Sequence, residues 1–162
     1  MLTENAPGNA EACGVIIRAA TVNDIPAIAE IEAACFSRPW SEKALSDTLE
    51  SDFGHLVCAE TPDGVIAGYA GIYCLGDAGE ITNIATLPAF RRRGIAAAVI
   101  TFLLSTAAEH GARDAYLEVR DSNMGARHLY ESLGFFENGR RKNFYQDPRE
   151  DAVLMTKPLQ KD

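Results

Sequence analysis

The apolar positions of the chain first follow a helical period. Between residues 25 and 36 they recur every three or four positions, Thr21 is placed to cap the segment, and Pro26 falls in its first turn. A second apolar stripe covers residues 44–49 and follows Ser41, another residue type that caps helices. These patterns predict two short helices in succession.

Before the first helix, and again from residue 55 onward, the chain has the period of strands. Apolar and β-branched runs predict strands at residues 15–18, 55–60, 65–75, 80–87, 115–120, 135–140 and 151–156. A long apolar run predicts a helix over residues 94–110 that Gly111 ends, and a shorter helix up to Gly134 precedes the last two strands. The order β-αα-βββ-α-β-α-ββ predicts a single α/β domain with a mixed sheet.

Length and composition fit this single domain. The chain has 162 residues, of which 47% are hydrophobic and 23% charged, so it can bury a core without a metal or a disulfide. Residues 1–14 are small and polar, and we expect a flexible N-terminal tail there, followed by the domain at residues 15–162. The tail lacks the basic and apolar regions of a signal peptide, and no run reaches the roughly 18 apolar residues of a membrane span.

Charge and cysteine spacing narrow the classes of partner. Lysine and arginine number 15 against 23 acidic residues, a net charge of −8, which disfavours nucleic acid and anionic membranes as partners. The cysteines form no C-x-x-C pair and share no ligand spacing with the histidines, so we expect no metal site. Scattered cysteines in apolar runs are typical of buried thiols in a cytoplasmic protein; they are Cys13, Cys35, Cys58 and Cys74.

Three consecutive arginines, Arg91, Arg92 and Arg93, precede the long predicted helix. The first turn of a helix has unpaired amide groups and partial positive charge, and the arginines add full charges. Gly94 and Ala96 leave room for a ligand to approach the backbone. This combination suits a pyrophosphate group, and a solvated basic turn is the alternative. The glycine patterns of P-loop and dinucleotide-binding proteins are absent.

Two motifs resemble those of the GCN5-related N-acetyltransferases, the GNAT family. The loop Arg91-x-x-Gly94-x-Ala96, which follows a strand ending in N-I-A-T, resembles the acyl-CoA loop of that family. The string L-Y-E-S-L-G-F at residues 129–135 is widespread in the family. The order of elements also matches over residues 15–159, so the resemblance covers nearly the whole chain.

Further motifs are similar to one branch of the family, whose members acetylate the N-terminal alanine of a small-subunit ribosomal protein. They are P-W-S at residues 39–41, L-E-V-R at residues 117–120 and R-E-D-A at residues 149–152. The resemblance implies the GNAT fold, an α/β (α+β) architecture with a mixed, mostly antiparallel central sheet flanked by helices. It also implies an enzyme that uses acetyl-CoA as co-substrate, needs no metal and acts on the N-terminus of a protein.

The resemblance implies a role for each site residue. Glu118 is expected to take the proton from the attacking amine, and Tyr130 to protonate the leaving thiolate. A larger set is expected to bind acetyl-CoA: Ile84, Ala85, Thr86, Arg91, Arg92, Arg93, Gly94, Ile95, Ala96, Ala97, Asn123 and Tyr130. The first three of these are also expected to supply the hydrogen-bond donors for the oxyanion. Other readings are an exposed Glu118 paired with a cross-strand arginine, a core tyrosine at Tyr130 and a simple helix cap at Asn123.

The acceptor side carries weaker signals. Trp40 and Tyr145 are expected to flank a slot for the peptide, and Trp40 equally suits packing between the first two helices. The acidic residues near those helices suit a basic peptide or a solvated surface; they are Glu30, Glu32, Glu42, Asp47 and Glu50. An α-amine with a pKa of about 7.8 is neutral at pH 7 several hundred times more often than a lysine of about 10.4, which favours an N-terminal acceptor.

The motifs leave other functions open. The same fold suits acetylation of a lysine side chain or a small amine, and it suits a regulatory module that binds acyl-CoA without catalysis. A remote option is an interaction domain in which residues 91–93 grip a phosphoprotein. For the enzyme, the family implies direct attack of the amine in a ternary complex, so no cysteine is expected to carry the acetyl group.

Overall fold

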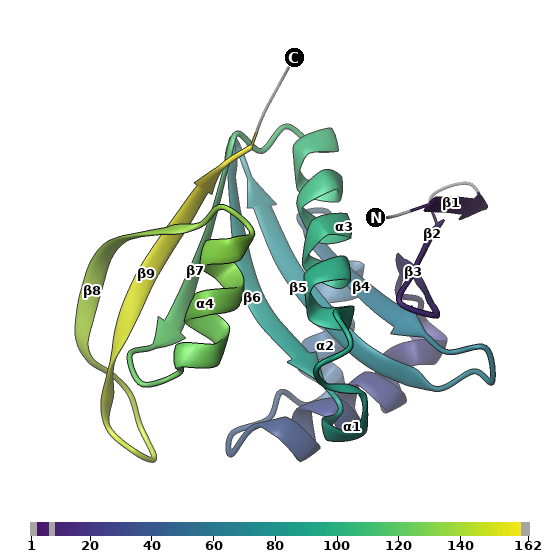
Figure 1. Ribbon diagram of the computed structural model, residues 1–162, viewed down its shortest axis with the longest axis horizontal. Helices are drawn as coiled ribbons and strands as arrows, with labels where there is room; N and C mark the ends of the chain where they lie inside the picture. The colour runs from purple at the N-terminus through teal and green to yellow at the C-terminus, as the bar shows by residue number, and fades with distance from the viewer. Residues whose placement is uncertain (1–2, 7–8, 160–162) are drawn as a thin grey trace.

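One mixed sheet runs through the chain, of which the computed structural model describes residues 3–6 and 9–159. Within these residues the sheet has nine strands in the order β1-β2-β3-β4-β5-β6-β7-β9-β8 (Figure 1). The strands are β1 (Thr3–Ala6), β2 (Asn9–Ala12), β3 (Val15–Ala19), β4 (Gly54–Glu60), β5 (Ile66–Leu75), β6 (Ala78–Thr86), β7 (Asp114–Arg120), β8 (Phe136–Tyr145) and β9 (Glu150–Pro158). All neighbouring strands are antiparallel except β6 and β7, which are parallel. The predicted mixed, mostly antiparallel sheet is confirmed.

The helices cover both faces of this sheet. They are α1 (Ile25–Cys35), α2 (Glu42–Glu50), α3 (Ile95–Glu109) and α4 (Met124–Ser132). In Figure 1, α3 and α4 lie on the near face and α1 and α2 on the far face. Two buried apolar clusters correspond to these layers, one containing Leu103 of α3 and the other Ile28 of α1 and Leu45 of α2. None of the described helices is long and apolar enough to span a membrane.

The helix ends follow the residue types that predicted them. Ser41 caps α2 by accepting a hydrogen bond from a first-turn amide at 3.1 Å, and Asn123 caps α4 in the same way at 3.2 Å. Gly111 and Gly134, just after α3 and α4, have φ of +93° and +99°, a conformation that glycine adopts without strain. Thr21 differs, because it caps a 3-10 turn at Val22–Asp24 that leads into α1.

Two parallel strands separate in the middle of the sheet. β6 and β7 pair only through Ala78–Glu80 and Asp114–Tyr116. Beyond Glu80, β6 continues with β5 alone as far as Thr86, while β7 continues with β9 as far as Arg120. Figure 1 shows the two strands diverging from the top of the view to the bottom. The two halves of the sheet are therefore joined only where β6 and β7 are paired.

The N-terminal segment differs from the expected flexible tail. β1 and β2 add two strands to the edge of the sheet, and β2 pairs with β3 across a two-residue turn, Cys13-Gly14. Both turn residues have positive φ, +57° and +79°, which suits a tight hairpin. Ala10 is buried against the core. The prediction was wrong for residues 3–6 and 9–12 because small and polar residues carry little strand signal; residues 1–2 and 7–8 lie outside the described part.

β8 is longer than the sequence predicted. We expected a strand that ends at Arg140 and a connecting segment over residues 141–150, but β8 continues to Tyr145. Nearly every residue of β8 is exposed, so the strand has no alternation of apolar and polar side chains to reveal it. Its pairing with β9 holds it at the edge of the sheet. This extension carries Arg141, Phe144 and Tyr145 to the opening between β6 and β7.

Candidate active site

A cavity of about 640 Å³ lies where β6 and β7 separate. Its walls come from the end of α1, the segment between α1 and α2, both diverging strands, α4 and the end of β8. The predicted site residues that line it are Trp40, Ile84, Glu118, Asn123, Tyr130 and Tyr145. Residues that are far apart in the sequence and were predicted for three different roles therefore meet in one cavity.

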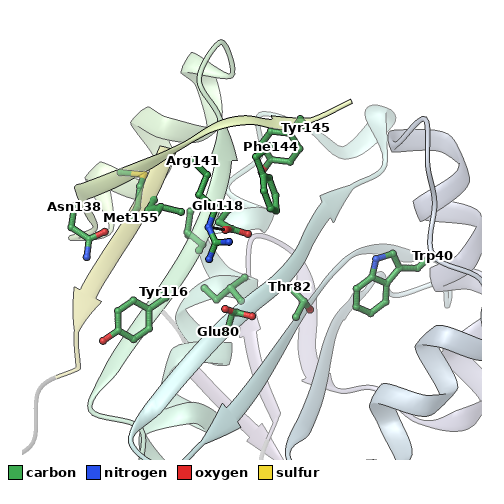
Figure 2. A pocket seen from close by; sticks show the side chains of 13 residues that line it. Trp40, Glu80, Thr82, Tyr116, Glu118, Asn138, Arg141, Phe144, Tyr145 and Met155 are labelled. Atoms are coloured by element: carbon green, nitrogen blue, oxygen red, sulfur yellow. Dashed lines mark ion pairs between the residues drawn. The ribbon is translucent and has the colours of Figure 1, made fainter. Parts of the chain in front are cut away.

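A second cavity, of about 470 Å³, adjoins the first. The two share the lining residues Trp40, Thr82, Glu118, Phe144 and Tyr145. Figure 2 shows this second cavity with Trp40 on one side, Phe144 and Tyr145 on another, and Glu118 beside Arg141. These aromatic side chains form two walls of the cavity, and Trp40 and Tyr145 are among them. Trp40 also packs against the cluster under α1 and α2, so core packing and a place in the cavity lining occur together.

Glu118 projects from β7 into both cavities. Its neighbours Leu117 and Val119 are buried in the core, and the alternation of a strand turns Glu118 the opposite way. The side chain is 31% exposed, and its Oε2 lies 2.9 Å from Nε of Arg141 on β8 (Figure 2). The alternative interpretation, an ion pair with an arginine, is therefore present together with the cavity position. A carboxylate held here can accept a proton from a group that enters the cavity.

Tyr130 lies on α4 and is buried, with its ring edge-on to Phe135 at a centroid distance of 6.0 Å. Burial raises the pKa of Tyr130 to about 12, with a smaller contribution from Tyr145. The hydroxyl therefore stays protonated at neutral pH and can act as a proton donor toward the cavity. Core packing and a place in the cavity lining occur together, so neither interpretation of Tyr130 excludes the other.

Tyr145, at the end of β8, lines the first cavity together with Tyr130. Burial and the charge of Glu118 raise the pKa of Tyr145 to about 12, while Arg120 opposes this shift. The guanidinium of Arg120 lies 4.6 Å from the centre of the Tyr145 ring and forms an ion pair with Glu150 at 3.2 Å. These contacts hold the aromatic wall in place.

Unpaired amides are concentrated at the start of α3. Gly94 is the cap, with a left-handed φ of +81°, and the first helical hydrogen bond runs from Ala98 N–H to the Gly94 carbonyl at 3.1 Å. In the part of the chain that the structure describes, the amides of residues 95–97 have no backbone acceptor. Ile95 is buried, and the small residues Ala96 and Ala97 leave the turn half-exposed. The turn can therefore bind an anion as predicted.

The three arginines take different directions. Arg91 turns back toward β6, donating from Nε to the Thr86 carbonyl at 3.1 Å and from Nη2 to Cys35 Sγ at 3.4 Å. Arg93 lies over the ring of Phe90, 5.2 Å from its centre. Arg92 is exposed and has a positive φ of +64°. Arg92 and Arg93 are thus exposed, whereas Arg91 joins the loop to Thr86 and to Cys35 at the first cavity.

Glu32 is a residue that the sequence interpretation placed wrongly. We assigned it to an acidic surface that either attracts a peptide or is solvated, but its side chain is fully buried and lines the first cavity. The signal was its position, because residue 32 follows Ile28 by four and falls on the apolar stripe of α1. Thr82, Asn83, Arg141 and Phe144 were also missed; all four line the cavities.

The cysteines are all free, and they differ in exposure. Cys58 and Cys74 are buried as predicted, whereas Cys13 is exposed and Cys35 half-buried. Burial raises the pKa of the Cys58 thiol to about 12, so it is not a nucleophile at neutral pH. Within the described residues no group of three or more histidine, cysteine, aspartate or glutamate side chains is arranged to hold a metal ion.

Comparison with known proteins gives the family. Residues 25–135 match the sequence model of the acetyltransferase (GNAT) family. The chain belongs to the acetyltransferase (GNAT) family. Among GNAT relatives, the [ribosomal protein bS18]-alanine N-acetyltransferase of Escherichia coli K12 is 38% identical over 140 residues, which cover 84% of this chain and 92% of the relative. The protein of the same name from Salmonella typhimurium is 35% identical over 141 residues, 86% of this chain and 94% of the relative.

Solved GNAT structures agree with the fold. The crystal structure of the ribosomal-protein-S18-alanine N-acetyltransferase from Escherichia coli has a TM-score of 0.81 and 34% identity, covering 90% of this chain and 94% of that one. The NatC complex bound to Gag peptide and CoA includes a chain with a TM-score of 0.78 and 20% identity, covering 90% of this chain and 99% of that one. The second likeness shows the fold alone.

Proposed function

We propose that this protein transfers the acetyl group of acetyl-CoA to the N-terminal amine of a protein, with the N-terminal alanine of ribosomal protein bS18 as its acceptor. The observation that carries the proposal is the cavity in which a carboxylate, Glu118, and a protonated phenol, Tyr130, both line the opening between two diverging strands. Relatives at 35% and 38% identity that are named for the acetylation of bS18 support the choice of acceptor.

The residues at the start of α3 fit the diphosphate of the donor. The amides of residues 95–97 and the exposed charges of Arg92 and Arg93 provide the donors and the positive field that a diphosphate needs. Arg91 contributes by fixing the loop to the Thr86 carbonyl. Asn123, at the opposite edge of the first cavity, is available to bind the donor while it caps α4.

The edge of β6 fits the acyl group. Beyond Glu80 this edge has no strand partner on the β7 side in the described part of the sheet, so the amides of alternate residues within 84–86 have no strand acceptor there, while the Thr86 carbonyl accepts from Arg91. Amides held by a rigid strand stabilise a developing oxyanion without reorganisation. We assign this role to the amides within Ile84, Ala85 and Thr86.

Glu118 and Tyr130 then divide the two proton transfers. Glu118 accepts a proton from the acceptor's ammonium group, and the neutral nitrogen attacks the thioester carbonyl carbon. The C–N bond forms, the C–S bond breaks, and Tyr130 gives its proton to the departing sulfur. The nitrogen keeps one proton as the amide N–H and loses the other to solvent, and Tyr130 is reprotonated from solvent. Because the pKa of Tyr130, about 12, lies above that of an ordinary thiol, about 8.5, the second transfer is uphill in free energy by a few kcal/mol. The arriving ammonium competes with Arg141 for the Glu118 carboxylate.

The acceptor enters between the aromatic walls. Trp40 lines one side of the second cavity and Phe144 and Tyr145 another, and the cavity has a volume of about 470 Å³. An exposed ion pair joins these walls, with Arg38 Nε 2.8 Å from Asp147 Oδ2. An N-terminal amine suits this site because it loses its proton far more readily than a lysine.

A mass-spectrometric assay with matched peptides tests the proposal. One peptide begins with a free alanine and contains an internal lysine, and its partner has the same sequence with a blocked N-terminus. With acetyl-CoA, we expect a single acetyl group on the free N-terminus and at least about a hundredfold lower rate on the blocked peptide. Equal rates on the two peptides, or acetylation of the lysine alone, would reject an N-terminal acceptor.

A further inference from the structure

The buried carboxylate of Glu32 is surrounded by hydrogen-bond donors. Its Oε1 accepts the backbone N–H of Trp40 at 2.8 Å, and its Oε2 accepts the Asn83 amide at 3.0 Å. The Tyr69 hydroxyl also donates to Oε2. Tyr69 keeps its proton, since burial and the neighbouring Glu32 raise its pKa. Three donors around one side chain match an ionised carboxylate, which can only accept.

This carboxylate decides which way the Asn83 amide faces. A carboxylate cannot donate to the Asn83 carbonyl, so the NH₂ group of Asn83 must point to Glu32 and its Oδ1 must point away. Asn83 lines the first cavity together with Glu118 and Tyr130. Its Oδ1 is buried and has no hydrogen-bond partner in the described part of the chain. A buried carbonyl in this state is unfavourable unless a ligand brings a donor.

We propose that Asn83 is an acceptor-binding residue and that Glu32 is its positioning residue. Glu32 holds the Asn83 carbonyl toward the cavity, where it accepts a hydrogen bond from an N–H of the acceptor's first residue. This inference rests on the proposed function. The acceptor is the occupant that fits, because its N-terminal end carries several N–H groups and has to lie beside Glu118 in the same cavity.

The same carboxylate also fixes the opposite wall. Trp40 donates its backbone N–H to Glu32, and its side chain forms one of the aromatic walls of the second cavity. Glu32 therefore ties the segment between α1 and α2 to β6, and both surfaces that meet the acceptor depend on one buried group. A substitution at residue 32 should act on the acceptor and leave binding of the CoA diphosphate, at the start of α3, unchanged.

Steady-state kinetics on three variants test this assignment. Asn83→Ala removes the carbonyl, and we expect the KM for an alanine-initiated peptide to rise about five- to tenfold, with the KM for acetyl-CoA within about twofold of that of the unmodified protein. Glu32→Gln offers an NH₂ group to Asn83, which turns the Asn83 amide over, so the peptide KM should rise by a similar factor. Circular dichroism and the melting-temperature increase on CoA binding show that each variant is folded.

Tyr69→Phe is the matched control. It removes one donor to Glu32 but leaves the orientation of Asn83 set, so the peptide KM should stay within about twofold even where the melting temperature falls. Unchanged peptide KM in both Asn83→Ala and Glu32→Gln would overturn the assignment, and so would an equal rise in Tyr69→Phe, which would indicate general loosening. If the unmodified protein acetylates no peptide N-terminus, the proposed function itself fails, and this inference with it.

Discussion

At the level of single residues, Glu118 has two partners that compete for it. In the structure its carboxylate binds Arg141 at 2.9 Å, and in the proposed reaction it receives a proton from the acceptor. We expect Glu118→Gln to lower kcat about a hundredfold, because the amide keeps the shape but cannot accept the proton. The CoA dissociation constant, measured by calorimetry, should stay within about twofold.

Glu131 is an exposed carboxylate on α4, so Glu131→Gln serves as the control for Glu118→Gln and should leave kcat unchanged. A Glu118→Gln protein that binds CoA and retains full kcat would contradict the assigned base. If no peptide is acetylated by either the variant or the unmodified protein, and both bind CoA, a peptide N-terminus is not the acceptor.

The raised pKa of Tyr130 predicts how kcat depends on pH. An acid must be protonated to act, and burial raises the pKa of Tyr130 to about 12, so deprotonation of this residue should not lower kcat below about pH 11. The ordinary phenol value near 10 would instead produce a falling limb around that pH. Measuring kcat from pH 7 to pH 10.5 separates the two; a limb near 10 that disappears in Tyr130→Phe would show that this raised pKa is wrong.

Sequence motifs predicted those site residues that belong to a short characteristic motif. Glu118 lies in L-E-V-R and Tyr130 in L-Y-E-S-L-G-F, and both line the predicted site. Glu32 and Asn83 carry no such string, and their roles arise from contacts between α1 and β6, which are 51 residues apart in the chain. A single sequence does not reveal a pairing of this kind, although a glutamate on an apolar helix stripe is a usable sign of a buried charge.

At the level of elements, the start of α3 depends on backbone conformation. Gly94 has a φ of +81°, and a Cβ there would approach Cys13 Sγ to 3.1 Å. We expect Gly94→Ala to cost about 1 kcal/mol of stability and to weaken CoA binding severalfold, because the first turn that presents the amides must shift.

Gly94→Asn places a Cβ at the same point but tolerates the left-handed conformation better, so it should lose less stability and less CoA affinity than Gly94→Ala. Thermal unfolding and calorimetry with CoA measure both quantities. Identical losses in the two variants would show that the approach to Cys13, and not the backbone conformation, sets the cost.

Periodicity predicted most elements because it reports which face is buried. α1, α2, α3 and the central strands each carry an apolar face, and their predicted positions match the structure closely. β8 was missed in length because an exposed edge strand holds its place by backbone pairing, and β2 was missed because its small and polar residues carry little strand signal. The missed part of β8 forms one wall of the site, so this error affected the site more than the fold.

At the level of the whole molecule, we expect the reaction to proceed without a covalent intermediate on a thiol. The two buried cysteines, Cys58 and Cys74, have raised pKa values caused by burial, and neither lines the cavities, whereas Cys35 lines the first cavity. We expect a variant with Cys13→Ser, Cys35→Ser, Cys58→Ala and Cys74→Ala to retain kcat. Its free energy of unfolding should fall by about 1 kcal/mol for each buried site, and its melting temperature should fall with it. A folded, CoA-binding variant with no activity would instead require an acyl-cysteine step.

The order of elements was sufficient to predict the architecture, but the site is a property of the complete fold. Its cavity forms because β6 and β7 pair for only three residues each and then separate. How far two strands stay paired depends on packing across both faces of the sheet, which local periodicity does not encode. Residue patterns alone did not predict this feature.

The most direct measurement is a crystal structure with CoA and an alanine-initiated peptide bound. We expect the CoA diphosphate to lie against the first turn of α3, and the CoA sulfur to lie between the Glu118 carboxylate and the Tyr130 hydroxyl. We expect the N-terminus of the peptide between Trp40 and Tyr145. A diphosphate bound away from α3, or a sulfur out of reach of both Glu118 and Tyr130, would contradict the proposed reaction.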